Sequence, residues 1–217
     1  AYRERAADFQ PAQYDPQVWA ALAREGGMRY AVLTAKHHDG FCLFDSEVSD
    51  FTSVDTGAGR DLMAEYVEAF RDAGLRVGLY YSLADWQWPA YFAGPEKDPE
   101  GFETFIDYTH TQVRELCSNY GPLDVLWFDG SWPHDAETWR VEELFSMIRD
   151  LQPHILINDR ACLPGDFDTP EQRILGSAPD RPWESCITSV ERHWGYHAGE
   201  RLWKTPERVI HSLAQVA

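Results

Sequence analysis

A carboxylate between two tryptophans is the first feature of this sequence that could do chemistry. Asp129 ends the apolar run 123–129 and is followed by Gly130, with Trp127 before it and Trp132 after it. Apolar runs of this length that end at a turn-forming residue are typical of buried β-strands. In barrels of parallel strands, the residues at the carboxyl ends of the strands share one mouth, where catalytic groups collect. Asp129 is therefore a candidate catalytic residue.

Polar and aromatic side chains end each of the four strands that the sequence predicts. These strands cover residues 29–35, 75–82, 123–129 and 154–158, and their ends carry His37, His38, Tyr80, Tyr81, Trp127, Asp129, Asn158 and Arg160. A single histidine at a strand end is more often a structural group than a ligand-binding one. Four consecutive strand ends of this kind are harder to explain by packing, and they predict one shared pocket.

A retaining glycosidase needs two catalytic carboxylates. One carboxylate attacks the anomeric carbon, and the other protonates the leaving oxygen and later activates water. The partners available to Asp129 are Asp166, Asp168, Glu171 and Glu184. The two aspartates also fit a turn beside Gly165, and Glu171 after Pro170 also fits the first turn of a helix. Spacing alone does not choose among them.

The adjacent histidines His37 and His38 raise the alternative of a metal site, since imidazole is a common zinc ligand. Neighbouring residues on an extended chain point to opposite faces, so we expect that these two side chains do not chelate one ion together. A hydrogen bond to a substrate hydroxyl is the other interpretation. The sequence contains no HxH or HExxH motif, so a metal-dependent hydrolase is the weakest reading.

Helices are expected between the strands, at residues 15–24, 61–73, 100–119, 136–151 and 205–216, with a long loop at 85–99 and a further short strand at 186–189. This alternation predicts βαβ units and a parallel sheet. No glycine-rich phosphate loop follows the first strand, which argues against a doubly wound sheet. We therefore expect an α/β fold of the (β/α)8 TIM-like barrel type, with residues 1–217 forming one segment of a catalytic domain.

Composition narrows the classes of ligand. The net charge of −17 argues against nucleic acid and anionic membrane surfaces as partners, and no apolar run is long enough to span a bilayer. Four cysteines without a CxxC pair indicate neither a zinc knuckle nor a disulfide framework. Nine Trp, ten Tyr and eleven Phe suit platforms for sugar rings, although ordinary packing explains them equally well. Oligomeric state and compartment are not indicated.

Several motifs in the order of the chain resemble the α-L-fucosidases of glycoside hydrolase family 29. They are the run 30–46 with Lys36-His37-His38-Asp39-Gly40-Phe41, then Gly78-Leu79-Tyr80-Tyr81-Ser82, Leu126-Trp127-Phe128-Asp129-Gly130, Gly165-Asp166-Phe167, Thr169-Pro170-Glu171, Trp183-Glu184-Ser185-Cys186 and Trp194-Gly195-Tyr196. The resemblance extends over nearly the whole chain.

The resemblance implies a retaining exo-hydrolase that removes terminal α-L-fucose from a fucosylated glycan or glycoconjugate, without a metal or organic cofactor. Asp129 would be the nucleophile and Glu171 the acid/base, with Glu184 as the alternative. The residues implied to hold the fucose ring and hydroxyls are His37, His38, Tyr80, Trp127 and Arg160, and Trp194 would cover the apolar side near the methyl group. An inactive homologue that only binds fucose is the competing interpretation.

Two departures from the family pattern accompany the resemblance. A strand with a His-Trp-Gly motif and a further Glu-Trp pair, which open the family's catalytic domain, do not occur before Ala1, and the last barrel strands are not matched. At 217 residues the chain is also shorter than the roughly 250 of a complete barrel. Because open sheet edges expose backbone groups, we expect this segment by itself to fold poorly and to turn over little substrate.

Overall fold

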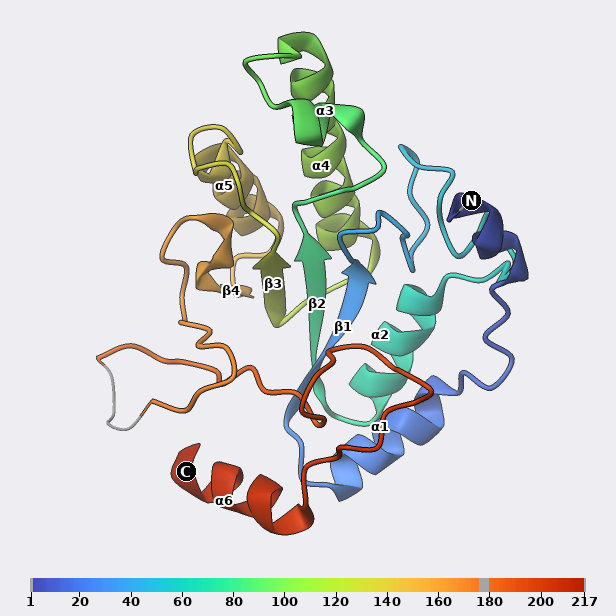
Figure 1. The fold of residues 1–217 in the computed structure, drawn as a ribbon, viewed down its shortest axis with the longest axis vertical. Coiled ribbons are helices and arrows are strands. Elements are labelled where there is room, and N and C mark those ends of the chain that lie inside the picture. The colour runs from blue at the N-terminus through green and yellow to red at the C-terminus, as the bar shows by residue number, and fades with distance from the viewer. Residues whose placement is uncertain (1, 176–179, 217) are drawn as a thin grey trace.

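A parallel sheet of four strands forms the centre of the molecule (Figure 1). The computed structural model describes residues 2–175 and 180–216. The strands are β1 (Tyr30–Lys36), β2 (Arg76–Ser82), β3 (Val125–Asp129) and β4 (Leu156–Ile157), and they lie side by side in the order of the chain. All three neighbouring pairs are parallel, which confirms the predicted α/β class with βαβ connections.

Three of the helices begin directly after an aspartate, and two of these three have proline as their first residue. The helical elements are η1 (Arg3–Asp8), α1 (Pro16–Glu25), α2 (Leu62–Asp72), α3 (Pro89–Ala93), α4 (Pro99–Asn119), α5 (Val141–Leu151), η2 (Asp159–Ala161) and α6 (Pro206–Val216). Asp15, Asp61 and Asp98 each precede a helix, and each carboxylate accepts a hydrogen bond from a backbone N–H of the first turn. Such caps satisfy donors that would otherwise lack a partner.

The two faces of the sheet differ because side chains alternate along each strand. Leu79, Tyr81, Leu126 and Phe128 are buried on one face, within the main hydrophobic core that α2, α4 and α5 complete. Trp127 faces the other way, in a smaller cluster with Val125 and Phe167, against which Val32, Tyr80 and Cys186 pack. The candidate site residues Tyr80 and Trp127 therefore lie on the face opposite the main core.

Four local predictions differ from the structure. Of the strand predicted at 154–158, only Leu156–Ile157 forms part of the sheet. The helix predicted at 136–151 begins only at Val141, because residues 136–140 form turns and Arg140 has a positive φ of 51°. Residues 186–189 form no strand; Cys186 makes a single bridge to Glu171. The loop 85–99 contains the short helix α3. None of these differences changes the order of the sheet.

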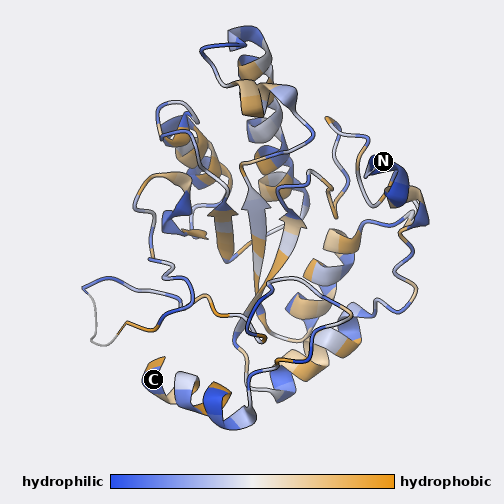
Figure 2. Cartoon of the chain, in the orientation of Figure 1, coloured by the Kyte–Doolittle hydropathy of each residue, from blue (hydrophilic) through white to orange (hydrophobic). Residues whose placement is uncertain are grey.

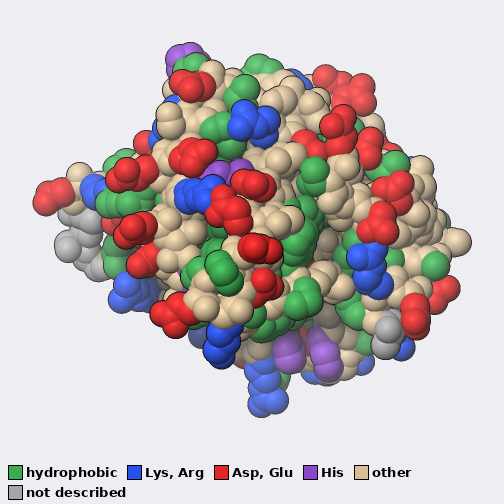
Figure 3. Space-filling model, turned by 90° about the horizontal axis from the view of Figure 1, so that it is seen from above, with side chains coloured by type: hydrophobic (Ala, Val, Ile, Leu, Met, Phe, Trp, Pro, Cys, Tyr) green, Lys and Arg blue, Asp and Glu red, His purple; other side chains and the backbone are tan. Residues whose placement is uncertain are grey.

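The face of the molecule toward which the strands point is rich in acidic side chains. Figure 3 views the molecule from the side toward which the strands point and shows Asp and Glu spread over this face, with fewer Lys and Arg. Such a face does not suit a polyanionic ligand.

Helix α6 alternates hydrophilic and hydrophobic residues (Figure 2) and buries none of them. No helix in the described part of the chain is long and apolar enough to cross a membrane.

Candidate active site

A pocket of about 770 Å³ opens at the carboxyl ends of β1, β2 and β3. The nine residues proposed as catalytic or sugar-binding line it: His37, His38, Tyr80, Trp127, Asp129, Arg160, Glu171, Glu184 and Trp194. The expectation that Tyr81 and Asn158 share this pocket is wrong, because Tyr81 points into the main core and the Asn158 side chain bonds the backbone of Phe128. Asp166 and Asp168 do not line the pocket, because they pair with Arg149 and Arg181 outside it. The structure thus reduces the four possible partners of Asp129 to the two glutamates.

The register of the sheet builds the floor of the pocket. Thr34, Tyr80 and Trp127 are neighbours across β1, β2 and β3, so their side chains form one row on the same face. The rings of Tyr80 and Trp127 stack with centroids 5.5 Å apart, and His37 stacks on Tyr80 at 5.7 Å. The sheet therefore presents a continuous aromatic surface, of the kind on which an apolar sugar face can pack.

Asp129 lies two residues beyond Trp127 on this face, and its carboxylate has two partners. Oδ2 accepts a hydrogen bond of 2.9 Å from the Tyr80 hydroxyl, and Oδ1 lies 3.5 Å from Nη1 of Arg160. Burial, followed by the negative charge of Asp129, raises the pKa of Tyr80, so the phenol stays protonated and remains a donor. These contacts orient an Asp129 side chain that is only 15% exposed.

Arg160 brings a second carboxylate close to the first. Its Nη1 lies 3.0 Å from Oε2 of Glu171 and 3.5 Å from Oδ1 of Asp129. The distance between these two carboxylate oxygens therefore cannot exceed the sum of the two distances. Retaining glycosidases hold their carboxylates about 5–5.5 Å apart, which this arrangement allows. Thr169 fixes the guanidinium through its hydroxyl and carbonyl oxygens, both at 3.0 Å. Glu171 is 45% exposed, at the mouth of the pocket.

Glu184 lies on the wall of the same pocket with both carboxylate oxygens occupied. Oε1 accepts a hydrogen bond of 3.1 Å from the Trp127 indole, and Oε2 accepts one from the Tyr30 hydroxyl. Burial and the nearby Glu184 charge raise the pKa of Tyr30, which keeps it a donor. The contacts of Glu184 are those of a group that fixes Trp127 in place.

Sequence reasoning missed several pocket residues. Val32 and Thr34 alternate with Tyr30 on the pocket side of β1, and the period-two pattern of that strand was the signal that could have found them. Cys186 and Gly195 line the pocket from the irregular C-terminal part, where no periodic signal exists.

The expectation that His37 and His38 point to opposite faces is wrong. Both line the pocket, and their ring centroids are 3.9 Å apart. The alternation of a strand does not apply to them, because β1 ends at Lys36 and the chain turns at the histidines. Within residues 2–175 and 180–216, no group of three or more His, Cys, Asp or Glu side chains is placed to hold a metal ion.

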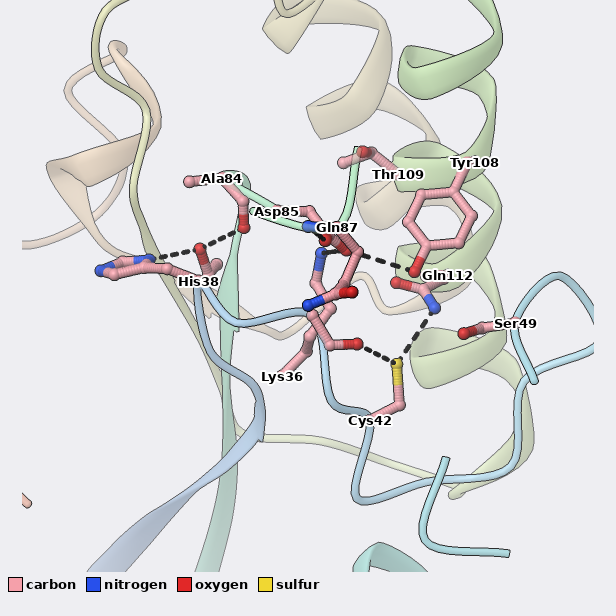
Figure 4. A network of polar contacts seen from close by, with 12 residues as sticks. Lys36, His38, Cys42, Ser49, Ala84, Asp85, Gln87, Tyr108, Thr109 and Gln112 are labelled. Atoms are coloured by element: carbon pink, nitrogen blue, oxygen red, sulfur yellow. Dashed lines mark hydrogen bonds and ion pairs between the residues drawn. The ribbon is translucent and has the colours of Figure 1, made fainter. Parts of the chain in front are cut away.

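A buried ion pair lies beneath this histidine turn (Figure 4). Nζ of Lys36 is 3.1 Å from Oδ2 of Asp85, and both side chains are completely buried. The ammonium also lies 4.6 Å from the centre of the Tyr81 ring, and the Tyr108 hydroxyl donates to Asp85 over 3.3 Å. The pair joins the last residue of β1, directly before the two histidines, to the loop after β2. No local sequence pattern predicts this pair.

Breaking this pair is expected to destabilise the protein strongly. Lys36→Met leaves the buried Asp85 charge without its cation, which costs about 3–5 kcal/mol in the free energy of unfolding. Arg76→Met is the matched control, because its pair with Asp124 is exposed, with the arginine side chain 75% accessible, and exposed pairs contribute roughly 0–1 kcal/mol. Urea unfolding of both variants measures the difference. Equal stability losses would contradict the role given to the pair.

Comparisons with known proteins identify the family to which this chain is similar. The chain matches the family model described as Alpha-L-fucosidase over residues 1–217. Tissue alpha-L-fucosidase of Homo sapiens is 32% identical over 230 aligned residues, which cover 99% of this chain and 48% of that protein. Alpha-L-fucosidase of Branchiostoma floridae is 34% identical over 211 residues, covering 88% and 46%. The chain spans about half the length of the curated relatives that it matches.

Two solved structures are similar over nearly all of the chain. Alpha-L-fucosidase isoenzyme 1 from Paenibacillus thiaminolyticus has a TM-score of 0.90 and 44% identity, covering 99% of this chain and 57% of that one. A GH29 alpha-L-fucosidase from Bacteroides thetaiotaomicron, described as a trapped covalent intermediate with 2-fluoro-fucosyl fluoride, has a TM-score of 0.89 and 31% identity, covering 96% and 54%.

Proposed function

This chain belongs to the α-L-fucosidase family, and from that premise we propose that its protein is a retaining exo-glycosidase that hydrolyses terminal α-L-fucosides. The observation that carries the proposal is the position of Arg160, whose Nη1 lies within 3.5 Å of Asp129 and within 3.0 Å of Glu171. Two carboxylates that share one guanidinium in an aromatic pocket match the needs of this reaction.

In the proposed reaction, Asp129 attacks the anomeric carbon of the fucoside. The bond between that carbon and the glycosidic oxygen breaks, while Glu171 gives its proton to the leaving oxygen. A covalent glycosyl-aspartate forms. Glu171, now a carboxylate, then takes a proton from water, which attacks the same carbon and releases Asp129. Two inversions give net retention, and no cofactor takes part. The Bacteroides relative described as a trapped covalent intermediate supports this scheme.

The remaining pocket residues are proposed to bind the sugar of a fucosylated glycan or glycoconjugate. His37, His38, Tyr80 and Arg160 offer hydrogen-bonding groups to its hydroxyls, and the Trp127 ring offers an apolar platform. Trp194 lies at the exposed rim of the pocket, where it would cover the side of the sugar that carries the methyl group.

We propose further that the four strands are consecutive strands of a (β/α)8 barrel and that residues 1–217 are one segment of its catalytic domain. Two observations support this: sequential strands are spatial neighbours, and the pocket lies at their carboxyl ends.

The protein that carries this chain is expected to hydrolyse an aryl α-L-fucoside and to release α-L-fucose as the first product, as seen by NMR before mutarotation. The matched aryl α-L-rhamnoside is the control and is expected to react far more slowly, because the pocket residues are proposed to recognise fucose. A chelator is expected to leave the rate unchanged. Tight binding of fucose without any turnover would overturn the proposal and favour a binding protein.

A further inference from the structure

The imidazole of His38 makes one hydrogen bond to the protein, and it is a buried one. Its Nδ1 lies 2.6 Å from Oγ of Ser82, the last residue of β2, and Ser82 is completely buried. Nε2, on the other side of the ring, has no hydrogen-bond partner in the described part of the chain. His38 lines the sugar pocket, so Nε2 is the nitrogen available to a ligand.

The donor in the hydrogen bond between His38 and Ser82 can be assigned from the second contact of the Ser82 hydroxyl. The Ser82 hydroxyl donates to the carbonyl oxygen of Ala84 over 2.7 Å, and Figure 4 shows His38 and Ala84 at the two ends of this path. A hydroxyl has a single proton to donate. Because that proton is used, Ser82 must accept from His38, and Nδ1 carries the hydrogen.

The surroundings of His38 favour the neutral form of its ring. Burial is the largest effect that lowers the pKa of His38, and His37 and Lys36 act in the same direction, whereas Asp129 and Asp39 act against them. In a neutral imidazole with hydrogen on Nδ1, Nε2 is an acceptor.

We propose that Ser82 is a positioning residue that holds His38 as the Nδ1–H tautomer, so that Nε2 accepts a hydrogen bond from a hydroxyl of the bound sugar. The tautomer follows from the geometry of the protein. Its use for a sugar hydroxyl rests on the fucosidase function proposed above.

Gly130 supplies a second, independent observation. Its φ is +71°, and a Cβ at this position would lie 2.7 Å from Ser82 Oγ and 3.0 Å from both His38 Nδ1 and Ala84 Cβ. Any side chain would therefore displace the path from His38 to Ala84. The glycine after Asp129 therefore leaves room for this hydrogen-bond path, which ties the histidine to the end of β2.

The acceptor at Nε2 has a consequence for specificity. A sugar hydroxyl can donate to it, whereas a deoxy or O-methyl analogue at that position cannot. A site that is built around a polar partner discriminates strongly against a ligand that leaves the partner unpaired.

The test begins with the protein free of sugar. In ¹⁵N-histidine NMR at neutral pH, the His38 signals, assigned by their loss in His38→Gln, are expected to show a protonated Nδ1 and an unprotonated Nε2. In Ser82→Ala the opposite tautomer is expected to become populated, and Ser82→Thr, which keeps a hydroxyl, is expected to restore the original one. A wild-type His38 that carries hydrogen on Nε2, or a tautomer unchanged in Ser82→Ala, would overturn the proposal.

The second experiment compares KM and kcat of the wild-type protein and its variants. Ser82→Ala is expected to raise KM for an aryl α-L-fucoside roughly tenfold, about the value of one neutral hydrogen bond, with a smaller change in kcat, and Ser82→Thr is expected to recover most of it. Ser53→Ala is the control, since Ser53 is equally buried and donates to the Arg60 carbonyl away from the pocket. If the protein shows the expected tautomer but does not turn over a fucoside, the proposed function is refuted and the positioning role of Ser82 is not. If Ser82→Ala does not fold, the wild-type spectrum and the Ser82→Thr kinetics still decide the outcome.

Discussion

Replacing Asp129 with Ala is expected to lower kcat/KM for aryl α-L-fucosides by at least about 10⁴-fold, as removal of a covalent nucleophile does in other enzymes. The physical reason is that no other carboxylate occupies the position of Asp129 at the end of β3, between the Tyr80 hydroxyl and Arg160. The comparison is made on the protein that carries this chain, with wild type and variant assayed side by side. Asp168→Ala is the control, because this aspartate pairs with Arg181 outside the pocket.

The stereochemistry of an added nucleophile gives a sharper readout for Asp129→Ala than the rate. Azide is small enough to enter the space left by the carboxylate and attacks the face opposite the leaving group. The expected product is β-L-fucosyl azide, with inverted configuration. Near-normal activity of Asp129→Ala, or azide rescue with retention, would show that Asp129 is not the nucleophile.

Replacing Glu171 with Ala is expected to slow the hydrolysis of fucosides with poor leaving groups by about 10²–10⁴-fold, the usual contribution of general acid catalysis. An aryl fucoside with an activated leaving group needs little protonation, so bond cleavage in that substrate should be much less affected. Azide replaces water in the second step of this variant and is expected to give α-L-fucosyl azide, with retained configuration.

Glu184→Ala is the matched variant for this experiment, because both glutamates line the same pocket. Glu184 has both oxygens engaged by Tyr30 and Trp127, so its loss is expected to weaken sugar binding and raise KM without a dependence on the leaving group. If leaving-group dependence and retained azide product appear in Glu184→Ala instead, the acid/base is Glu184.

Local sequence patterns were sufficient for the sheet and for most of the pocket. The apolar runs before Lys36, within 75–82 and before Asp129 place three strand ends correctly, because burial on two faces demands such runs whatever the rest of the fold does. The prediction for the helix at 136–151 failed in its first five residues. Apolar spacing there resembles a helix, but the left-handed conformation of Arg140 separates the turns from α5.

Sequence by itself determined that Asp129, Tyr80, Trp127 and the two histidines share one mouth. Parallel strands carry their carboxyl ends to the same edge, so strand-end residues meet regardless of their separation along the chain. The residue pattern left four acids open as partners of Asp129 and the family resemblance favoured two of them, but only the tertiary structure shows that Glu171 and Glu184 line the pocket. Glu171 and Glu184 lie in irregular backbone, where no periodicity relates position to direction, and their partners are distant: Tyr30, which binds Glu184, is 154 residues away. The buried pair of Lys36 and Asp85 and the Ser82 contact of His38 depend likewise on how two loops pack, which no local pattern encodes.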